Sequence, residues 1–342
     1  NGGVIALGNF AGANLTVGIN NTLVGHNSLG TATTAVKNTA LGWQAMADVK
    51  AGVAVDGCVA IGYSALIGNS SNTTGINGTV AIGTSALAAL TSGADNTAVG
   101  ELALNALTIG AGNVAVGTRA ADVTVEGTYN TAIGSDALAT NVNGDNNTAV
   151  GQGALFTFNS ANEGKNTAIG SEAGGYVSTG QSNTFVGYKA GQCNSSTNLT
   201  GDYNTAIGES AGQRLQGAAH SNTLVGFKTG EDISTGIANT FLGYYSGGTT
   251  TATNYCVAIG YEAMSAPNVE SGANHTIAIG TNSLNALTSG ARNIGLGYQS
   301  LVALTQGDDN IALGYDALGG LSTTDGSDKN IAIGSYAMNG VS

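Results

Sequence analysis

The residues of this sequence that could carry out chemistry are few, and their settings favour structural roles. Gly208-Glu209-Ser210-Ala211-Gly212 matches the G-x-S-x-G turn that presents a nucleophilic serine in many hydrolases. That turn needs a strand leading into a helix, followed by an acid and a histidine. Ser210 instead belongs to an ordinary copy of a short repeated phrase. We therefore expect no catalytic serine and no enzymatic activity.

Candidate metal ligands are equally scattered. His26, His220 and His275 lie far apart in the sequence and show no H-E-x-x-H spacing. The acidic turns, Asp308-Asp309 and Asp325-Gly326-Ser327-Asp328, lack the pattern of calcium-binding β-rolls and EF-hand loops. The sequence predicts solvated turns, with no metal and no cofactor.

The three cysteines, Cys58, Cys193 and Cys256, are expected to be free thiols. Cys58 and Cys256 occupy the same position of two distant repeats, where asparagine is usual. Stacked repeats that far apart are beyond the reach of a disulfide. We expect both to be small buried substitutes for asparagine.

The most suggestive set is aromatic. Eight aromatic residues each follow the glycine that ends the repeated phrase: Trp43, Tyr63, Tyr188, Phe227, Tyr244, Tyr261, Tyr298 and Tyr315. Rings spaced one repeat apart can stack on one another and cover a sheet edge. Alternatively, they can form a strip that binds glycans, with the C-terminal half as the contact surface. Both interpretations require a scaffold that places the rings in one column.

The repeated phrase supplies that scaffold. It reads Asn-Thr-Ala-(Ile/Val/Leu)-Gly and occurs nineteen times between residues 1 and 342, with eleven of eighteen intervals equal to 17 residues. A short fixed period predicts a stack of like units, each in contact with its neighbours. Positions are numbered here from the anchor glycine of each unit: Gly8, Gly25, Gly42, Gly62, Gly83, Gly100, Gly117, Gly134, Gly151, Gly170, Gly187, Gly208, Gly226, Gly243, Gly260, Gly280, Gly297, Gly314 and Gly334.

The composition agrees with an all-β repeat and excludes several functions. Only 9% of residues are charged, against roughly 25% in an average domain, which argues against solvated helices. The net charge of −12 disfavours nucleic acid and anionic membranes as partners. No segment has the roughly 18 apolar residues of a membrane span. The chain opens inside a repeat, so the lack of a signal peptide says little about export.

Each unit is predicted to contain two short strands. The first covers positions −4 to −1, the anchor glycine turns the chain, and the second covers +1 to +5. A return turn follows, rich in Gly, Asp and Asn, and all longer units are lengthened there. The sequence therefore predicts one continuous domain, residues 1–342, folded as a parallel β-solenoid of about nineteen coils.

The strands also predict a second interface. Positions −1 and −2 point to opposite faces of a strand, yet both are apolar throughout. One face can line the interior of the coil, and the other needs another surface. We expect that surface to be identical chains, most simply three. The alanines at −2 and the small residues at +3 fit a close approach of backbones there.

The asparagine at −4, present in fourteen units, has two interpretations. One is an internal ladder of amides, each bonded to the next coil. The other is an ice-binding face built from regular Asn-Thr rows. The ladder is favoured, because ice-binding solenoids expose flat threonine ridges and here threonine lies between apolar columns.

The phrase also resembles known repeats. Units such as Asn130–Leu138, Asn147–Leu155 and Asn166–Ala173 resemble those of phage tail fibres, and Val59–Gly62, Val80–Gly83 and Val257–Gly260 are similar to the head repeats of trimeric autotransporter adhesins. This resemblance implies a homotrimeric, left-handed parallel β-roll with a role in surface attachment.

Together these observations predict a structural attachment protein, the shaft or receptor-binding segment of a phage tail fibre. Its expected partners are identical chains, other virion tail proteins and a host cell-surface polysaccharide or receptor. The alternatives are a bacterial adhesin or extracellular filament subunit at the cell surface and, less favoured, a tailspike that cleaves glycans.

Overall fold

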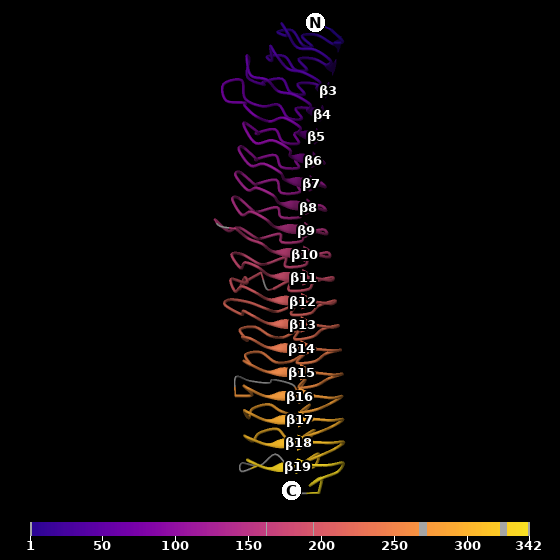
Figure 1. Ribbon diagram of the computed structural model, residues 1–342, viewed down its shortest axis with the longest axis vertical. Helices are drawn as coiled ribbons and strands as arrows, with labels where there is room; N and C mark the ends of the chain where they lie inside the picture. The colour runs from indigo at the N-terminus through magenta and orange to yellow at the C-terminus, as the bar shows by residue number, and fades with distance from the viewer. Residues whose placement is uncertain (1, 162, 194, 267–271, 322–326, 341–342) are drawn as a thin grey trace. The chain divides into compact units, whose positions relative to one another are not determined.

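The computed structural model describes residues 2–161, 163–193, 195–266, 272–321 and 327–340. They form two compact units, unit 1 (Asn1–Asn166) and unit 2 (Thr167–Ser342). In both units every repeat contributes one three-residue strand followed by turns (Figure 1). The described residues contain no helix.

The strands occupy positions −3 to −1 of the repeats. Unit 1 contains β1 (Ile5–Leu7), β2 (Thr22–Val24), β3 (Thr39–Leu41), β4 (Val59–Ile61), β5 (Val80–Ile82), β6 (Thr97–Val99), β7 (Val114–Val116), β8 (Thr131–Ile133) and β9 (Thr148–Val150). Unit 2 contains β10 (Thr167–Ile169), β11 (Thr184–Val186), β12 (Thr205–Ile207), β13 (Thr223–Val225), β14 (Thr240–Leu242), β15 (Val257–Ile259), β16 (Ile277–Ile279), β17 (Ile294–Leu296), β18 (Ile311–Leu313) and β19 (Ile331–Ile333).

Within each unit, consecutive strands pair in parallel and in register. Ala132 of β8 lies opposite Ala149 of β9, for example, and Ile133 lies opposite Val150. Each position of the repeat therefore becomes a column of side chains that runs from coil to coil. The predicted parallel β-solenoid with a 17-residue period is confirmed.

The predicted second strand, +1 to +5, is wrong. Positions +2 and +4 have positive φ in every coil, as at Asp136 (56°) and Leu138 (55°). The N–H of Asp136 donates to the carbonyl of Thr118 in the preceding coil at 3.1 Å, whereas that of Leu138 donates to Ala154 in the following coil at 2.9 Å. Left-handed residues at every second position thus replace the strand, yet the backbone stays bonded to both neighbours.

The anchor glycine is required by both its conformation and its surroundings. Gly134 has φ +131°, a backbone that L side chains rarely adopt. A Cβ built on it would lie 2.6 Å from the carbonyl carbon of Gly151 in the next coil. Anchor glycines of neighbouring coils therefore pack backbone against backbone.

The interior of the coil is formed by the small residues. Ala132 at −2 and Ala137 at +3 are fully buried, whereas Ile133 at −1 is 38% exposed. A Cβ on Gly295, also at −2, would lie 2.6 Å from Oγ of Ser283 at +3, so these two columns meet inside the coil. The expectation that the alanine column faces a neighbouring chain is therefore wrong, because the close approach it permits is within the coil.

Phenylalanine at −2 is matched by glycine at +4 of the same coil. A Cβ on Gly191 would lie 2.2 Å from the ring of Phe185, and one on Gly247 would lie 2.3 Å from Phe241. A phenylalanine at −2 thus fills the space that a glycine at +4 leaves, and the interior of the coil stays closely packed.

Candidate functional site

The column at +1, directly after the anchor glycine, contains the eight aromatic residues selected from the sequence. All eight are exposed. In unit 1, Trp43 and Tyr63 stack with ring centres 4.9 Å apart and planes 6° apart, and His26 stacks on the other face of Trp43 at 6.0 Å. The structure therefore brings these two predicted residues together and adds a histidine.

In unit 2 the +1 column forms two stacked runs, one of three rings and one of two. Phe227, Tyr244 and Tyr261 stack at 5.3 and 5.0 Å, and Tyr298 stacks on Tyr315 at 5.0 Å. Tyr188 has no ring partner among the described residues, but the ammonium of Lys189 lies 5.2 Å from its ring centre. Mutual stacking covers most ring faces and leaves the ring edges toward solvent, so a sugar can stack only where a face remains open.

A second aromatic column, at −5, was not anticipated. Tyr129, Tyr203 and Tyr255 lie there on the return turn and are exposed, and Tyr255 stacks on His275 of the next coil at 5.0 Å. All four have positive φ. Their shared offset from the anchor glycine was the available signal.

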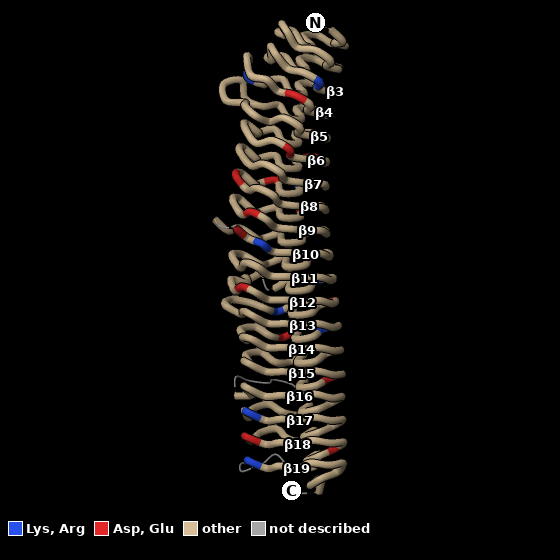
Figure 2. Tube along the Cα trace, viewed as in Figure 1, with Lys and Arg blue, Asp and Glu red and all other residues tan. Residues whose placement is uncertain are grey.

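The outward face of the strands, formed by positions −3 and −1, carries no charged residue in either unit. Position −1 is aliphatic in all nineteen strands, and −3 is Thr, Val or Ile. Figure 2 shows the few charged residues on the turns of the coils. Each unit therefore exposes a regular, uncharged strip of methyl groups and threonine side chains.

The asparagine column at −4 forms the predicted amide ladder. Asn130 is buried; its Nδ2 donates to Oδ1 of Asn113 at 3.3 Å and to the carbonyl of Gly144 at 2.8 Å. Its Oδ1 accepts from the backbone N–H of Asn147 at 3.0 Å. Because these asparagines point inward and the threonines at −3 point outward, the Asn-Thr rows of an ice-binding face do not form.

The thiols of Cys58 and Cys256 take the place of the ladder amide. Cys58 is buried and forms no disulfide, and its thiol donates to the backbone carbonyl of Ile76 at 3.1 Å. The thiol of Cys256 donates in the same way to the carbonyl of Ala273 at 3.0 Å. Burial raises the pKa of both thiols to about 11. Burial also raises the pKa of Cys193. All three thiols are free, as predicted, and Cys193 is buried as well as Cys58 and Cys256.

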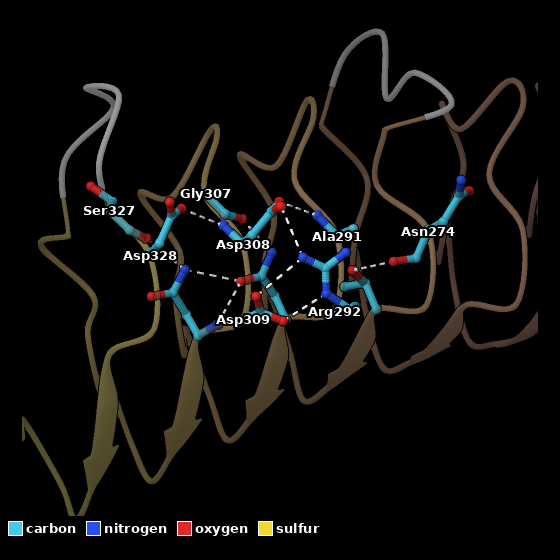
Figure 3. Close-up of polar contacts among 11 residues, drawn as sticks. Asn274, Ala291, Arg292, Gly307, Asp308, Asp309, Ser327 and Asp328 are labelled. Atoms are coloured by element: carbon cyan, nitrogen blue, oxygen red, sulfur yellow. Dashed lines mark hydrogen bonds and ion pairs between the residues drawn. The ribbon is translucent and has the colours of Figure 1, made fainter.

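The acidic turns belong to a further ladder at −6 (Figure 3). Oδ1 of Asp308 accepts from the backbone N–H of Ala291 at 2.8 Å, and Oδ1 of Asp328 accepts from that of Asp308 at 2.7 Å. Arg292 donates to Asp308 at 3.0 Å and to Asp309 at 2.6 Å, and it holds the pKa of Asp309 below its usual range. Asp325 and Gly326 of the predicted turn lie outside the described residues.

The remaining candidates show no catalytic arrangement. Ser210 is buried, and its N–H donates to the carbonyl of Tyr188 within the coil ladder. His220 forms a hydrogen bond with its neighbour Ser221, between Nδ1 and Oγ at 3.1 Å. No three His, Cys, Asp or Glu residues of the described ranges are grouped so as to hold a metal.

Comparisons with known proteins add no relative. No protein-family model matches the chain, and no curated protein matches it significantly. In the part of the chain that the structure describes, no helix has the length and apolar character needed to cross a membrane.

Proposed function

We propose that this chain is a structural, non-enzymatic segment of an attachment fibre in which identical chains pack along their outward strand faces. Phage tail fibres are the favoured setting, because the Asn-Thr-Ala-Ile-Gly units resemble theirs. Three chains are proposed on the resemblance to trimeric adhesin heads. The proposed ligand is a cell-surface polysaccharide.

The observation that supports this proposal best is the uncharged outward face. Fully burying an aliphatic side chain contributes about 1.5–3 kcal/mol, so covering the roughly one third that remains exposed contributes about 0.5–1 kcal/mol per coil. Ten coils of unit 2 then supply about 5–10 kcal/mol from position −1 alone. Association costs on the order of 4–15 kcal/mol, so this face is large enough to drive it once position −3 also contributes.

The period of the face favours an identical chain as the partner. The columns repeat once per coil, at about 4.8 Å. A partner that covers them over many coils must present apolar groups with the same spacing. A second copy has that spacing by construction, because its strands follow the same register.

Sedimentation velocity on the full chain tests the assembly. We expect a defined oligomer, three chains for a trimer, that dissociates when Ile133→Lys places a charge on the outward face. Asn146→Lys is the matched control, since Asn146 lies at position −5 and two other coils have a natural lysine there, Lys37 and Lys165. A wild-type chain that sediments as a stable monomer would refute the proposed assembly.

The proposed lack of catalysis has a separate test. Incubation with bacterial surface polysaccharides should release no new reducing ends. Release that disappears on replacing one turn acid, such as Asp308→Asn, would show a glycan-cleaving enzyme instead.

A further inference from the structure

The +1 column of unit 2 contains one small residue between two tyrosines. Tyr261 stacks on Tyr244 above, and Tyr298 stacks on Tyr315 below, both at 5.0 Å. The coil between them has Thr281 at +1. The N–H of Asn282 donates to the carbonyl of Tyr261 at 2.9 Å, and that of Gln299 donates to Thr281 at 3.0 Å, so the three coils are consecutive and in register.

This interruption has the thickness of one ring. Two coil spacings separate the backbones of Tyr261 and Tyr298, about 9.6 Å. In the uninterrupted part of the column, a middle ring such as Tyr244 fills that distance with partners 5.3 and 5.0 Å away. Threonine has no ring, so the ring slot, defined here as Tyr261, Thr281 and Tyr298, is closed at its base and open to solvent.

Both walls of the ring slot are accessible. Tyr261 is 48% exposed and Tyr298 is 42% exposed, and no described ring contacts the faces that they turn toward Thr281. Each tyrosine is held in place by its stacked neighbour on the opposite face. The slot is therefore preorganised, which reduces the cost of ordering side chains on binding.

Three polar side chains follow the slot residues directly in the sequence. They are Glu262, Asn282 and Gln299, each half-buried. The carboxylate of Glu262 lies beside the hydroxyl of Tyr261, and the hydrogen bond between them raises the pKa of Tyr261.

We infer that the ring slot binds a pyranose residue of a glycan, held between the faces of Tyr261 and Tyr298. The inference rests on the proposed attachment role. The C–H groups on the faces of a pyranose carry partial positive charge and match the negative faces of the two rings. Its hydroxyl groups can donate to the carboxylate of Glu262 beside Tyr261, which a planar apolar ring cannot do.

One other position of the column lies between two rings, and it provides the control. Glu209 separates Tyr188 from Phe227 in the same unit. Its side chain is longer than that of threonine and carries a charge. Glu209→Tyr and Thr281→Tyr therefore insert the same ring into equivalent positions, but only the second fills the proposed slot.

Saturation-transfer difference NMR tests the inference, with the methyl β-pyranosides of glucose, galactose and N-acetylglucosamine as probes. We expect saturation of the ring protons of at least one glycoside by the wild-type chain. Thr281→Tyr should weaken this binding at least tenfold without lowering the unfolding temperature, because its ring continues the stack. Glu209→Tyr should bind as the wild type does.

Three results would overturn the inference: no saturation of any of the three glycosides, equal binding by Thr281→Tyr, or p-cresol binding that Thr281→Tyr abolishes while no sugar binds. These outcomes are independent of the oligomer test. A monomeric chain that still binds sugar in the slot would refute the proposed fibre and leave the slot standing.

Discussion

Replacing Asn130 by alanine should remove one link of the buried amide ladder in unit 1 and destabilise the coils around it. The side chain of Asn130 makes two contacts with Asn147, to its backbone N–H at 3.0 Å and its amide at 3.1 Å. It also donates to Gly144 at 2.8 Å and to Asn113 at 3.3 Å. An alanine makes none of these bonds.

The size of the effect follows from the groups left behind. The N–H of Asn147 loses its partner in an interior from which water is excluded, whereas the carbonyl of Gly144 still accepts from the amide of Asn141 at 2.9 Å. One unsatisfied buried group costs about 1–3 kcal/mol, so the free energy of unfolding should fall by about 1–3 kcal/mol. A typical domain has only about 5–15 kcal/mol of stability, so the loss is readily measured.

Urea unfolding at a fixed protein concentration measures this loss, and hydrogen exchange of the Asn147 amide locates it. Asn143→Ala is the matched control, because Asn143 is half-buried and its side chain makes no hydrogen bond among the described residues. We expect the control to change the unfolding free energy by no more than about 0.5 kcal/mol.

A graded variant sharpens the test. Asn130→Cys should cost less than Asn130→Ala, because Cys58 at the same position still donates to a carbonyl and lies against the N–H of Thr79. If Asn130→Ala costs no more than the control, the ladder does not contribute to stability and the argument fails.

Two further predictions concern the backbone and the thiols. Gly134→Ala should lower the unfolding temperature more than Gly52→Ala does: both glycines have positive φ, but nothing lies within 4 Å of a Cβ at Gly52, so equal shifts would contradict the role given to coil stacking. Because burial raises the pKa of Cys58 and Cys256 from 9.0 to about 11, their contribution is complete below pH 9 and lost as the pH rises toward 11. The double variant Cys58→Ser, Cys256→Ser should therefore lose less stability than the wild type between pH 9 and 11 in urea titrations, and identical losses would rule this linkage out.

The strand and ladder positions could be predicted because each depends on one column of the repeat. Alternation along a strand places −4 and −2 on one side and −3 and −1 on the other. A column of asparagines on the inner side must then satisfy its own amides, which neighbouring coils do. Cys58 and Cys256 follow, since a thiol is the right size for the same site.

The second segment could not be predicted from propensity. Leucine at +4, as at Leu138, rarely adopts positive φ, and nothing in its own chemistry indicates that it does here. The available signal was indirect: glycine replaces leucine at +4 in six units, including Gly191 and Gly247. Exchange between leucine and glycine in one column indicates a left-handed position.

The direction of the two strand faces required volumes as well as periodicity. The two-residue period of a strand indicates that Ala132 and Ile133 point to opposite faces, but it does not indicate which of them lies inside the coil. Phenylalanine at −2 coincides with glycine at +4 in the same coil, as in Phe185 with Gly191, and such compensation occurs only where two side chains share a closed space. That pairing was present in the sequence and identifies the inner face.

Each position of the repeat occurs in nineteen coils, so the residues found there show what its environment accepts. Position −5 is exposed in most coils and accepts lysine, aspartate, tyrosine and glycine, as expected of a position that no other chain covers. Position −1 is also partly exposed, yet it is aliphatic every time. The interior of the coil does not impose this restriction, because these side chains point away from it, so we infer that a covering surface does. Position +1 also accepts threonine, glutamate and glutamine, so the fold does not require an aromatic residue there.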